Sequence, residues 1–226
     1  LKQNGYESML SSLSWEFNVV DSKQVNAFCM PGGKIVVYTG LLNLVGNGAH
    51  SDDELAAVMG HELSHALAKH ANERISNQML VQAGGQLLGA AVGSRSQMLG
   101  SLINQAYGIG AQVGVMLPFG RKQEYEADKM GLVLMAMAGY DPRYAVSFWQ
   151  KMAQSKGGNQ TNELLSTHPS DANRIKAIEE YLPTALQYYQ GGSSRESTGR
   201  TTSTTKKRSS SREVSANDIG SYLNGR

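Results

Sequence analysis

The sequence predicts an α+β protein that is mainly helical, with a small N-terminal sheet. The first 40 residues contain short β-branched and aromatic runs, and long helical patterns follow from Ser51. Of the 226 residues, 40% are hydrophobic, which is enough to bury the core of one compact domain with appendages. We therefore assign one domain to residues 1–190, followed by short segments at 191–212 and 213–226.

The sheet is predicted from three runs, WEFNVV, VNAFCM and KIVVYTG. Such runs are typical of strands because β-branched and aromatic side chains fit a pleated surface. Pro31, Gly32 and Gly33 separate the last two runs and supply turn residues, so these two strands are expected to form a hairpin.

Helical structure is predicted to begin near Ser51, where SDDE places a capping serine three residues before Glu54. The pattern LAAVMGHELSHALAKHANERI follows without proline, which favours one continuous helix. Residues 81–120 are small and apolar, and Arg95 is their only charged residue. We expect a helical hairpin there rather than disorder.

Three further helices are predicted in the C-terminal half. One runs through EYEADKMGLVLMAMA and stops at Gly139, and the next starts after Asp141 and Pro142. A third is expected to open at Ser170, in HPSDANRIKAIEEYL.

Residues 191–212 differ from the rest in composition. They hold six Lys or Arg against one Glu, so the remaining residues carry about three net negative charges. Because the chain has no apolar residue from Gln190 to Glu213, this basic segment is predicted to be disordered. The final SANDIGSYLNGR is expected to form a short docking helix. No basic face of the folded part indicates a nucleic-acid partner.

The sequence predicts no transmembrane segment, since no stretch reaches the roughly 18 to 20 uninterrupted apolar residues that span a bilayer. The nearest candidate, LVQAGGQLLGAAVG, is shorter and contains two glutamines. No leader follows Leu1, so any export signal is expected to be removed or absent. Cys29 is the only cysteine, which excludes a disulfide within the chain.

The stretch HELSHALAKH predicts a metal site. On a helix, His61 and His65 lie one turn apart on one face, so their imidazoles can reach one ion. Glu62 can then act as general base, because zinc lowers the pKa of a bound water to about 7. The same short pattern also arises by chance on helices with solvated histidines. His70 lies about 140° around from His65, and we interpret it, like His50, as a surface histidine.

A catalytic zinc site needs a third protein ligand and an open position for water. The metzincin pattern requires Gly and His where this chain has Ala68 and Ala71. Thermolysin-like sites require a Glu in the region occupied by Gly84 and Gly85. Both arrangements are excluded, so the third ligand is expected to be a more distant acid.

The segment RKQEYEADKMG, residues 121–131, contains three candidate acids. Glu124 and Asp128 share a helical face, whereas Glu126 lies about 200° around from Glu124 and is expected to face away. Two acids on one face repel unless they meet positive partners such as a metal ion and the N–H of a ligand histidine. Spacing alone leaves Glu124 and Asp128 equal.

Four segments occur together in the order NAFCMPGGKIVVYTGLL, DELAAVMGHELSHALAKH, RKQEYEADKMGL and THPSDANRI. In this order they resemble the HtpX-like and CAAX-prenyl-endopeptidase-like zinc metallopeptidases, the forty-eighth metallopeptidase family, over most of residues 20–182. The resemblance implies a zincin-like metallopeptidase domain with an active-site helix carrying HExxH and one Zn²⁺ per chain. Because no transmembrane segment is predicted, the chain is more similar to soluble bacterial envelope members of the LoiP and BepA type.

The resemblance also implies roles for individual residues. It makes His61, His65 and Glu124 the zinc ligands and Glu62 the catalytic base. Asp128 is then the acid that holds a ligand histidine.

Further roles are implied outside the metal ligands. His168 is expected to stabilise the oxyanion of the tetrahedral intermediate, as a catalytic residue. Arg174 is expected to orient substrate or the active-site loop, and its alternative is an exposed helix arginine. Asn26 is a further substrate-binding candidate. The segment 34–39 is similar to the family's edge strand beside the cleft, on which an extended peptide lies.

The first functional hypothesis is a zinc endopeptidase of the bacterial periplasm or cell envelope that cleaves misfolded or unassembled proteins. Its expected partners are these unfolded substrates and outer-membrane assembly machinery, with anchoring at the outer membrane through a missing N-terminal segment. The alternative is an envelope chaperone or assembly factor whose metal is structural and whose residues 81–120 bind clients. In a third hypothesis, His168 occupies the open metal position while residues 81–120 cover the cleft.

Overall fold

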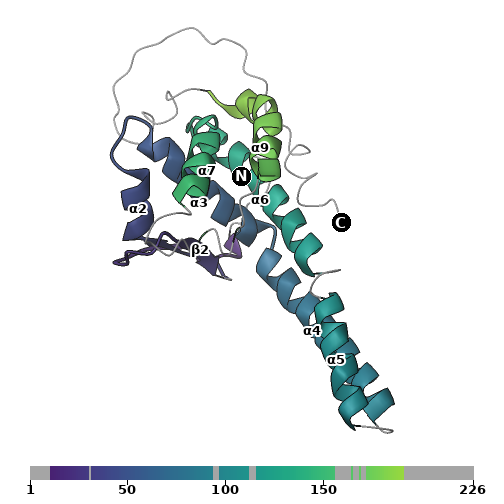
Figure 1. Cartoon of the computed structure of the whole chain (residues 1–226). Coiled ribbons are helices and arrows are strands. Elements are labelled where there is room, and N and C mark those ends of the chain that lie inside the picture. Colours follow the sequence, from purple (N-terminus) through teal and green to yellow (C-terminus); the bar gives the residue numbers. More distant parts are fainter. Residues whose placement is uncertain are drawn as a thin grey trace, which may run out of the picture. The chain divides into compact units, whose positions relative to one another are not determined.

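The computed structural model describes residues 11–30, 32–93, 97–111, 116–155, 164, 168 and 172–190. Its elements are β1 Glu16–Val20, β2 Ala27–Met30, β3 Lys34–Tyr38, α2 Thr39–Val45, α3 Ser51–Leu67, α4 His70–Gly93, α5 Gln97–Ala111, α6 Leu117–Met137, α7 Tyr144–Gln154, α9 Ala172–Ala185 and η4 Leu186–Tyr188 (Figure 1). The mainly helical α+β class is confirmed. The segments 191–212 and 213–226 lie outside the described residues, so their boundaries stay predictions.

The chain divides into two compact units, residues 1–68 with 125–226, and residues 69–124. Helix α6 belongs to both units: its residues up to Glu124 are in the second unit, and its residues from Tyr125 onward are in the first. We call them the sheet unit and the hairpin unit and describe each by itself.

The sheet of the sheet unit has the strand order β1-β3-β2. β2 and β3 form the predicted hairpin, and positive φ angles of 94° at Gly32 and 92° at Gly33 confirm the turn. β1 pairs with β3 in parallel. The prediction that 34–39 is an edge strand is therefore wrong, because β3 is hydrogen-bonded on both sides. The edge strand that packs on α3 is β2.

Helix α3 begins at Ser51, so the predicted serine cap is wrong: the N-cap is His50, whose side chain makes no capping hydrogen bond. Three acids in the first turn suit the positive end of the helix dipole instead. The helix also ends earlier than predicted, because Lys69 adopts a φ of 56° and separates α3 from α4. His70 opens α4 and is 1% exposed, so its interpretation as a surface histidine is wrong, whereas His50 is exposed as predicted.

The core of the sheet unit lies where α3, α7 and α9 pack together with the sheet. Its largest fully buried side chains include Trp149, Phe148 and Ile35. The predicted stop of α6 at Gly139 is confirmed by a φ of 84° there, and α7 starts after Pro142. The predicted helix start at Ser170 lies outside the described residues, and α9 is described from Ala172.

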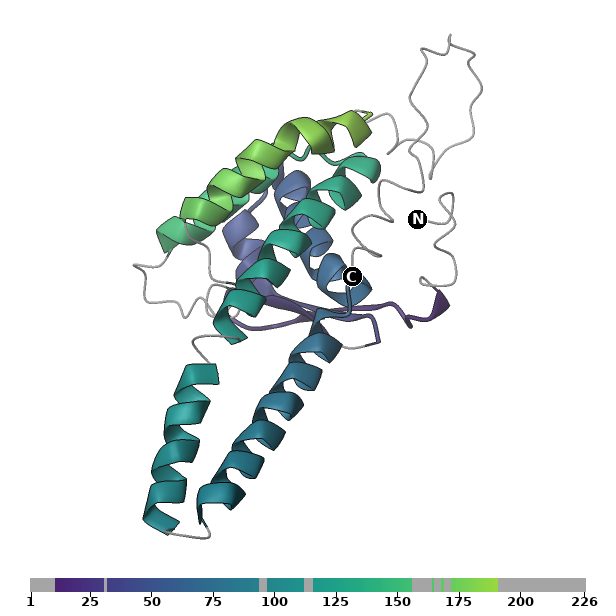
Figure 2. The same ribbon diagram turned by 90° about the vertical axis from the view of Figure 1, so that its right-hand side faces the viewer.

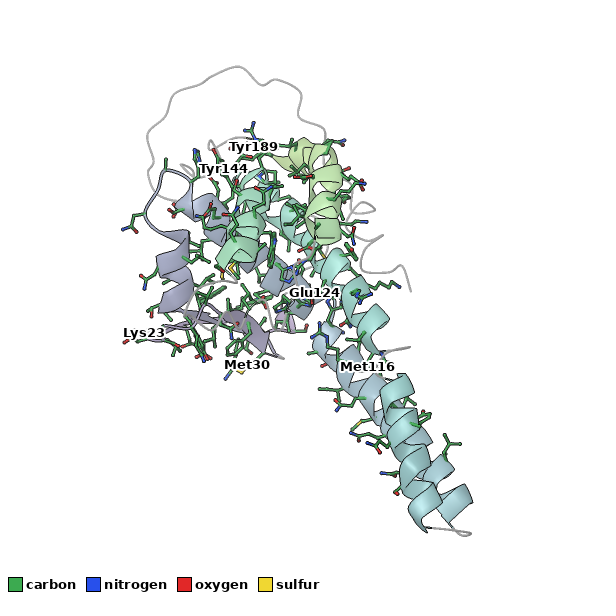
Figure 3. All side chains as sticks on the ribbon, in the orientation of Figure 1. Lys23, Met30, Met116, Glu124, Tyr144 and Tyr189 are labelled. Atoms are coloured by element: carbon green, nitrogen blue, oxygen red, sulfur yellow. The ribbon has the colours of Figure 1, made fainter. Side chains whose placement is uncertain are left out.

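The hairpin unit contains α4 and α5, which pack side by side (Figure 2). A Cβ atom at Gly84 would collide with the Tyr107 hydroxyl oxygen, and one at Gly85 would lie 3.3 Å from the Tyr107 ring, so the two glycines leave room for this side chain between the helices. The predicted helical hairpin is confirmed in the described residues, although it begins at His70. Figure 3 labels Met116, which directly precedes α6, and Glu124 on that helix. Every helix of the described residues is too short or too polar to span a bilayer.

Candidate metal centre

Two glycines bring the helices of the candidate site together. A Cβ atom at Gly60 would lie 2.7 Å from the carbonyl oxygen of Gly131, and one at Gly131 would lie 2.8 Å from the backbone nitrogen of His61. Real Cβ atoms do not approach backbone atoms this closely, so α3 and α6 can cross here only because both positions are glycine. The crossing places His61, the residue after Gly60, against the part of α6 that carries Asp128.

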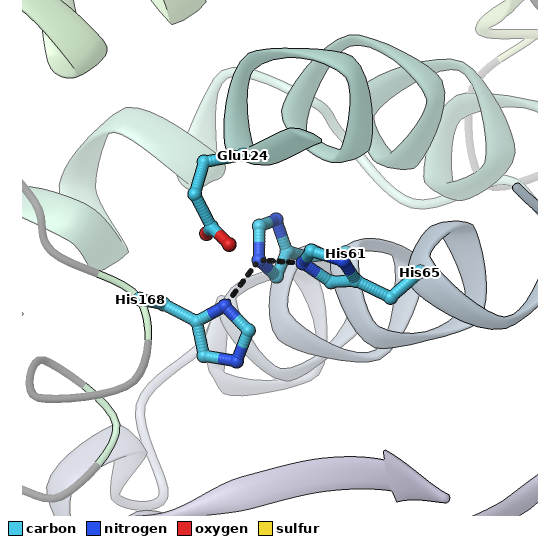
Figure 4. Close-up of side chains that lie close together, drawn as sticks. All are labelled: His61, His65, Glu124 and His168. Carbon is cyan, nitrogen blue, oxygen red and sulfur yellow. Dashed lines mark hydrogen bonds between the residues drawn. The ribbon is translucent and has the colours of Figure 1, made fainter. Parts of the chain in front are cut away.

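Four side chains form a group that could hold a metal ion: His61, His65, Glu124 and His168 (Figure 4). All four are buried, and one donor atom from each lies within 4.8 Å of the others. The Nε2 atom of His61 lies 3.0 Å from Nε2 of His65 and 3.2 Å from Nδ1 of His168. Two nitrogens that bind one tetrahedral zinc at about 2.0 to 2.1 Å are roughly 3.4 Å apart, so the donor set fits such an ion.

Asp128 does not join this group but holds one of its members. Its Oδ1 accepts a hydrogen bond of 2.9 Å from Nδ1 of His61, which leaves Nε2 of that ring directed at the group. Burial acts to raise the pKa of the Asp128 carboxyl, but the charge and hydrogen bonds of Arg174, together with the bond from His61, hold the pKa below its ordinary value. This geometry separates the two acids that spacing had left equal, since Glu124 faces the donor atoms and Asp128 faces His61.

Arg174 is 3% exposed, so the alternative of an exposed helix arginine is wrong. Its Nε and Nη2 donate to the two oxygens of Asp128 at 2.5 and 2.7 Å, and its Nη1 donates to the carbonyl of His168 at 3.2 Å. The guanidinium also lies over the ring of Trp149, 4.0 Å from its centroid. Arg174 thereby connects Asp128 to the backbone that carries His168.

Glu62 is 2% exposed and lies beside the histidine group. Its Oε2 accepts a hydrogen bond of 3.2 Å from the backbone N–H of Cys29, on β2. Its Oε1 is buried and has no hydrogen-bond partner among the described residues, with Nε2 of His168 at 3.5 Å. A buried carboxylate oxygen without a hydrogen bond lowers the stability of the fold, which indicates that a water or ligand binds beside it. Burial, and then the charge of Glu62, raise the pKa of the Cys29 thiol to about 11.

Glu124 has a hydrogen-bond partner in its own unit, the hairpin unit. Nη2 of Arg74, on α4, donates to its Oε1 at 3.1 Å. Nε of the same arginine donates to Oε1 of Gln123 at 2.7 Å. The ligand candidate therefore has a positively charged partner that the sequence did not indicate.

The remaining predicted residues lie outside the group. Asn26 is 7% exposed and precedes β2, and its carbonyl accepts a hydrogen bond from the backbone of Tyr38 at 3.0 Å. Its predicted contact with substrate stays a prediction. Glu126 is half-buried and, as predicted, is not among the grouped ligands.

Sequence reasoning did not identify three contributors to the site: Arg74, Trp149 and the backbone amide of Cys29. None of them belongs to a recognisable spacing, and each acts through a contact between separate elements. A detectable signal existed only for Cys29, which lies in a segment of the family resemblance.

The family model of peptidase family M48 matches residues 6–182 of this chain. The mitochondrial metalloendopeptidase OMA1 of Arabidopsis thaliana is 40% identical over 191 residues, which are 84% of this chain and 36% of that relative. The metalloprotease LoiP of Escherichia coli is 30% identical over 166 residues, 74% of this chain and 62% of the relative. The beta-barrel assembly-enhancing protease of Yersinia pestis is 31% identical over 168 residues, which are 71% of this chain and 33% of that relative. The chain spans less than two thirds of the length of each relative.

Proposed function

Because this chain belongs to peptidase family M48, we propose that it is the catalytic part of a zinc-dependent endopeptidase. The observation that carries the proposal is the buried group of His61, His65 and Glu124 with Glu62 beside it. Two imidazoles and one carboxylate are a donor set of catalytic zinc sites. When bound there, zinc lowers the pKa of water and polarises a carbonyl group.

Glu62 is the proposed general base. Its Oε1 takes a proton from the water that attacks the peptide carbonyl and then gives this proton to the leaving amine. The Cys29 amide fixes the other oxygen, so that the carboxylate keeps one orientation during this exchange. Asp128 keeps Nε2 of His61 directed at the ligand group through the bond to Nδ1.

The proposed substrate is an extended chain that lies along the outer edge of β2. Within the described part of the chain this strand pairs with β3 on one side only, and Cys29 directs its N–H from the other side toward Glu62. Pairing through backbone hydrogen bonds selects extended segments with little dependence on sequence. Misfolded or unassembled proteins offer such segments.

A bacterial periplasmic or cell-envelope location, with outer-membrane assembly machinery as partner, is the finer part of the proposal. It is supported by the name of the beta-barrel assembly-enhancing protease of Yersinia pestis. Other relatives are named mitochondrial. Fractionation of the source cells tests the location: recovery with periplasmic or outer-membrane markers supports it, and recovery elsewhere overturns it.

The test of the catalytic proposal compares Glu62→Gln with wild type and with Glu126→Gln as a matched control. Casein cleavage by the zinc-loaded protein should fall by about 10²- to 10⁴-fold in Glu62→Gln, the range of general-base contributions. The control should cleave like wild type. Undiminished cleavage by Glu62→Gln would refute the proposal. Elemental analysis of protein purified without added metal tests zinc itself.

His168 favours a second candidate, in which the resting site is blocked. The ring of His168 is buried and belongs to the donor group, so it could supply a fourth metal ligand. His168→Ala distinguishes this role from oxyanion stabilisation: cleavage rises if the ring blocks the site and falls if it stabilises the intermediate.

A client-binding role is favoured by exposed apolar side chains on α4. Ile75, Met79, Leu80, Leu87 and Leu88 are between 42% and 74% exposed. Apolar surface of this kind suits contact with unfolded chains. Replacing Met79, Leu80 and Leu87 by Gln in the Glu62→Gln background should abolish suppression of aggregation if this surface binds clients.

A further inference from the structure

We propose that Arg74 is a positioning residue of the metal centre, which orients the Glu124 carboxylate toward the metal. The proposal rests on the metal site of the proposed function but not on peptide cleavage. Arg74 lies on α4, in the same unit as Glu124, and its Nη2 donates to Oε1 of Glu124 at 3.1 Å. The Glu124 side chain is 6% exposed, so this contact acts on a buried ligand candidate.

Gln123 fixes the arginine from the neighbouring position. Its side-chain oxygen accepts the 2.7 Å bond from Nε of Arg74, while its Nε2 donates to Oε2 of Glu73 at 2.8 Å and to the carbonyl of His70 at 3.3 Å. These donor bonds determine which end of the amide faces Arg74. Gln123 is 2% exposed, so the arrangement is held inside the hairpin unit. The guanidinium is therefore fixed through two of its nitrogens.

Two effects of Arg74 on a metal ion oppose each other. A fixed carboxylate binds more tightly because the glutamate loses less side-chain freedom on binding. The positive charge of Arg74 repels a cation, which weakens binding. The Arg74 side chain is 41% exposed, so solvent screens this repulsion. We therefore expect the orienting effect to dominate.

The experiment measures the zinc dissociation constant of the full chain by competition with a chromophoric chelator. Arg74→Ala should weaken binding about tenfold, at the lower end of the range for residues that orient metal ligands. Gln123→Ala should weaken it in the same direction, and the double variant should bind no more weakly than Arg74→Ala, because Gln123 acts through Arg74. Arg74→Lys should fall between wild type and Arg74→Ala, since an ammonium group keeps the charge but not the planar geometry.

Arg121→Ala is the matched control, because it removes an exposed arginine three residues before Glu124. It should bind zinc like wild type. Zinc affinity of Arg74→Ala within twofold of wild type would overturn the proposal, as would a loss confined to the stability of the metal-free protein. If Arg74→Ala does not fold, Gln123→Ala and Arg74→Lys decide by the same criterion. Wild type that binds zinc but cleaves no peptide refutes the proposed function and leaves this inference standing.

Discussion

The sheet unit and the hairpin unit each hold an arginine against an acid of helix α6, but the two pairs differ in their exposure to solvent. Arg174 and Asp128 are both 3% exposed at the side chain and share two hydrogen bonds. Arg74 is 41% exposed and makes one hydrogen bond to Glu124. Breaking a buried charge pair leaves an unpaired charge in a low dielectric, whereas breaking a partly exposed pair admits water. We infer that Arg174 maintains the fold and that Arg74 adjusts a ligand.

The largest expected effect concerns the two acids of this comparison. Glu124→Ala should abolish zinc binding, because it removes a proposed ligand. Asp128→Ala should weaken binding by about 10- to 100-fold, since Asp128 orients the proposed ligand His61 and is not itself a proposed ligand. Isothermal titration with zinc measures both.

Glu126→Ala is the control for that series and should change little. If Glu126→Ala alone removed zinc binding, the prediction that Glu124 faces the metal and Glu126 lies on the opposite side of the helix would be wrong. Equal losses from Glu124→Ala and Asp128→Ala would remove the distinction between ligand and orienting acid.

The second prediction breaks the two arginine contacts in turn. Arg174→Met should lower the free energy of unfolding by about 3 to 5 kcal/mol, because it leaves the Asp128 charge buried without its partner. Arg74→Met should lower it by at most about 1 kcal/mol, since solvent reaches that pair. Urea unfolding of the metal-free protein measures both, and a similar loss in the two variants would contradict the comparison.

The third prediction compares two glycines of α6, one in each unit. Gly131→Ala should destabilise by about 1 to 3 kcal/mol, because its methyl group would lie 2.8 Å from the His61 backbone. Gly120→Ala should be neutral or stabilise by up to about 1 kcal/mol, since nothing lies within 4 Å of an added methyl group and alanine favours helix. Thermal unfolding distinguishes them, and a harmless Gly131→Ala would refute the close helix crossing.

The smallest effect is expected at a third pair of an arginine and an acid, Arg143 and Asp141, in which the arginine side chain is 63% exposed. Hydrogen bonds from Arg143 hold the pKa of Asp141 below its ordinary value, although burial opposes this. Asp141 has a lower pKa in the folded chain than in the unfolded chain, where an aspartate has a pKa of about 3.9. Its ionised form therefore stabilises the fold at pH values above about 3.9, and this stabilisation is lost as the pH falls through the pKa of the folded state. Asp141→Asn should therefore lower Tm slightly at pH 7, with the difference from wild type shrinking below about pH 4. A difference that grows in acid would contradict this assignment.

The sequence by itself determined the features that depend on neighbours along the chain. Helical periodicity placed His61 and His65 on one face and turned Glu126 away from Glu124. Paired glycines located the β2–β3 turn, and Gly139 located the end of α6. These inferences succeed because backbone geometry relates residues that are a few positions apart.

Tertiary structure decided what depends on contacts between elements. Spacing left Glu124 and Asp128 equal and the family resemblance chose between them, whereas the crossing of α3 and α6 shows why Asp128 meets His61. The strand order makes β2 an edge strand in place of the expected segment 34–39. The packing of the helices buries Arg174 against Asp128. No local pattern encodes these contacts, because each joins residues distant in the chain that become neighbours only when the helices and strands pack.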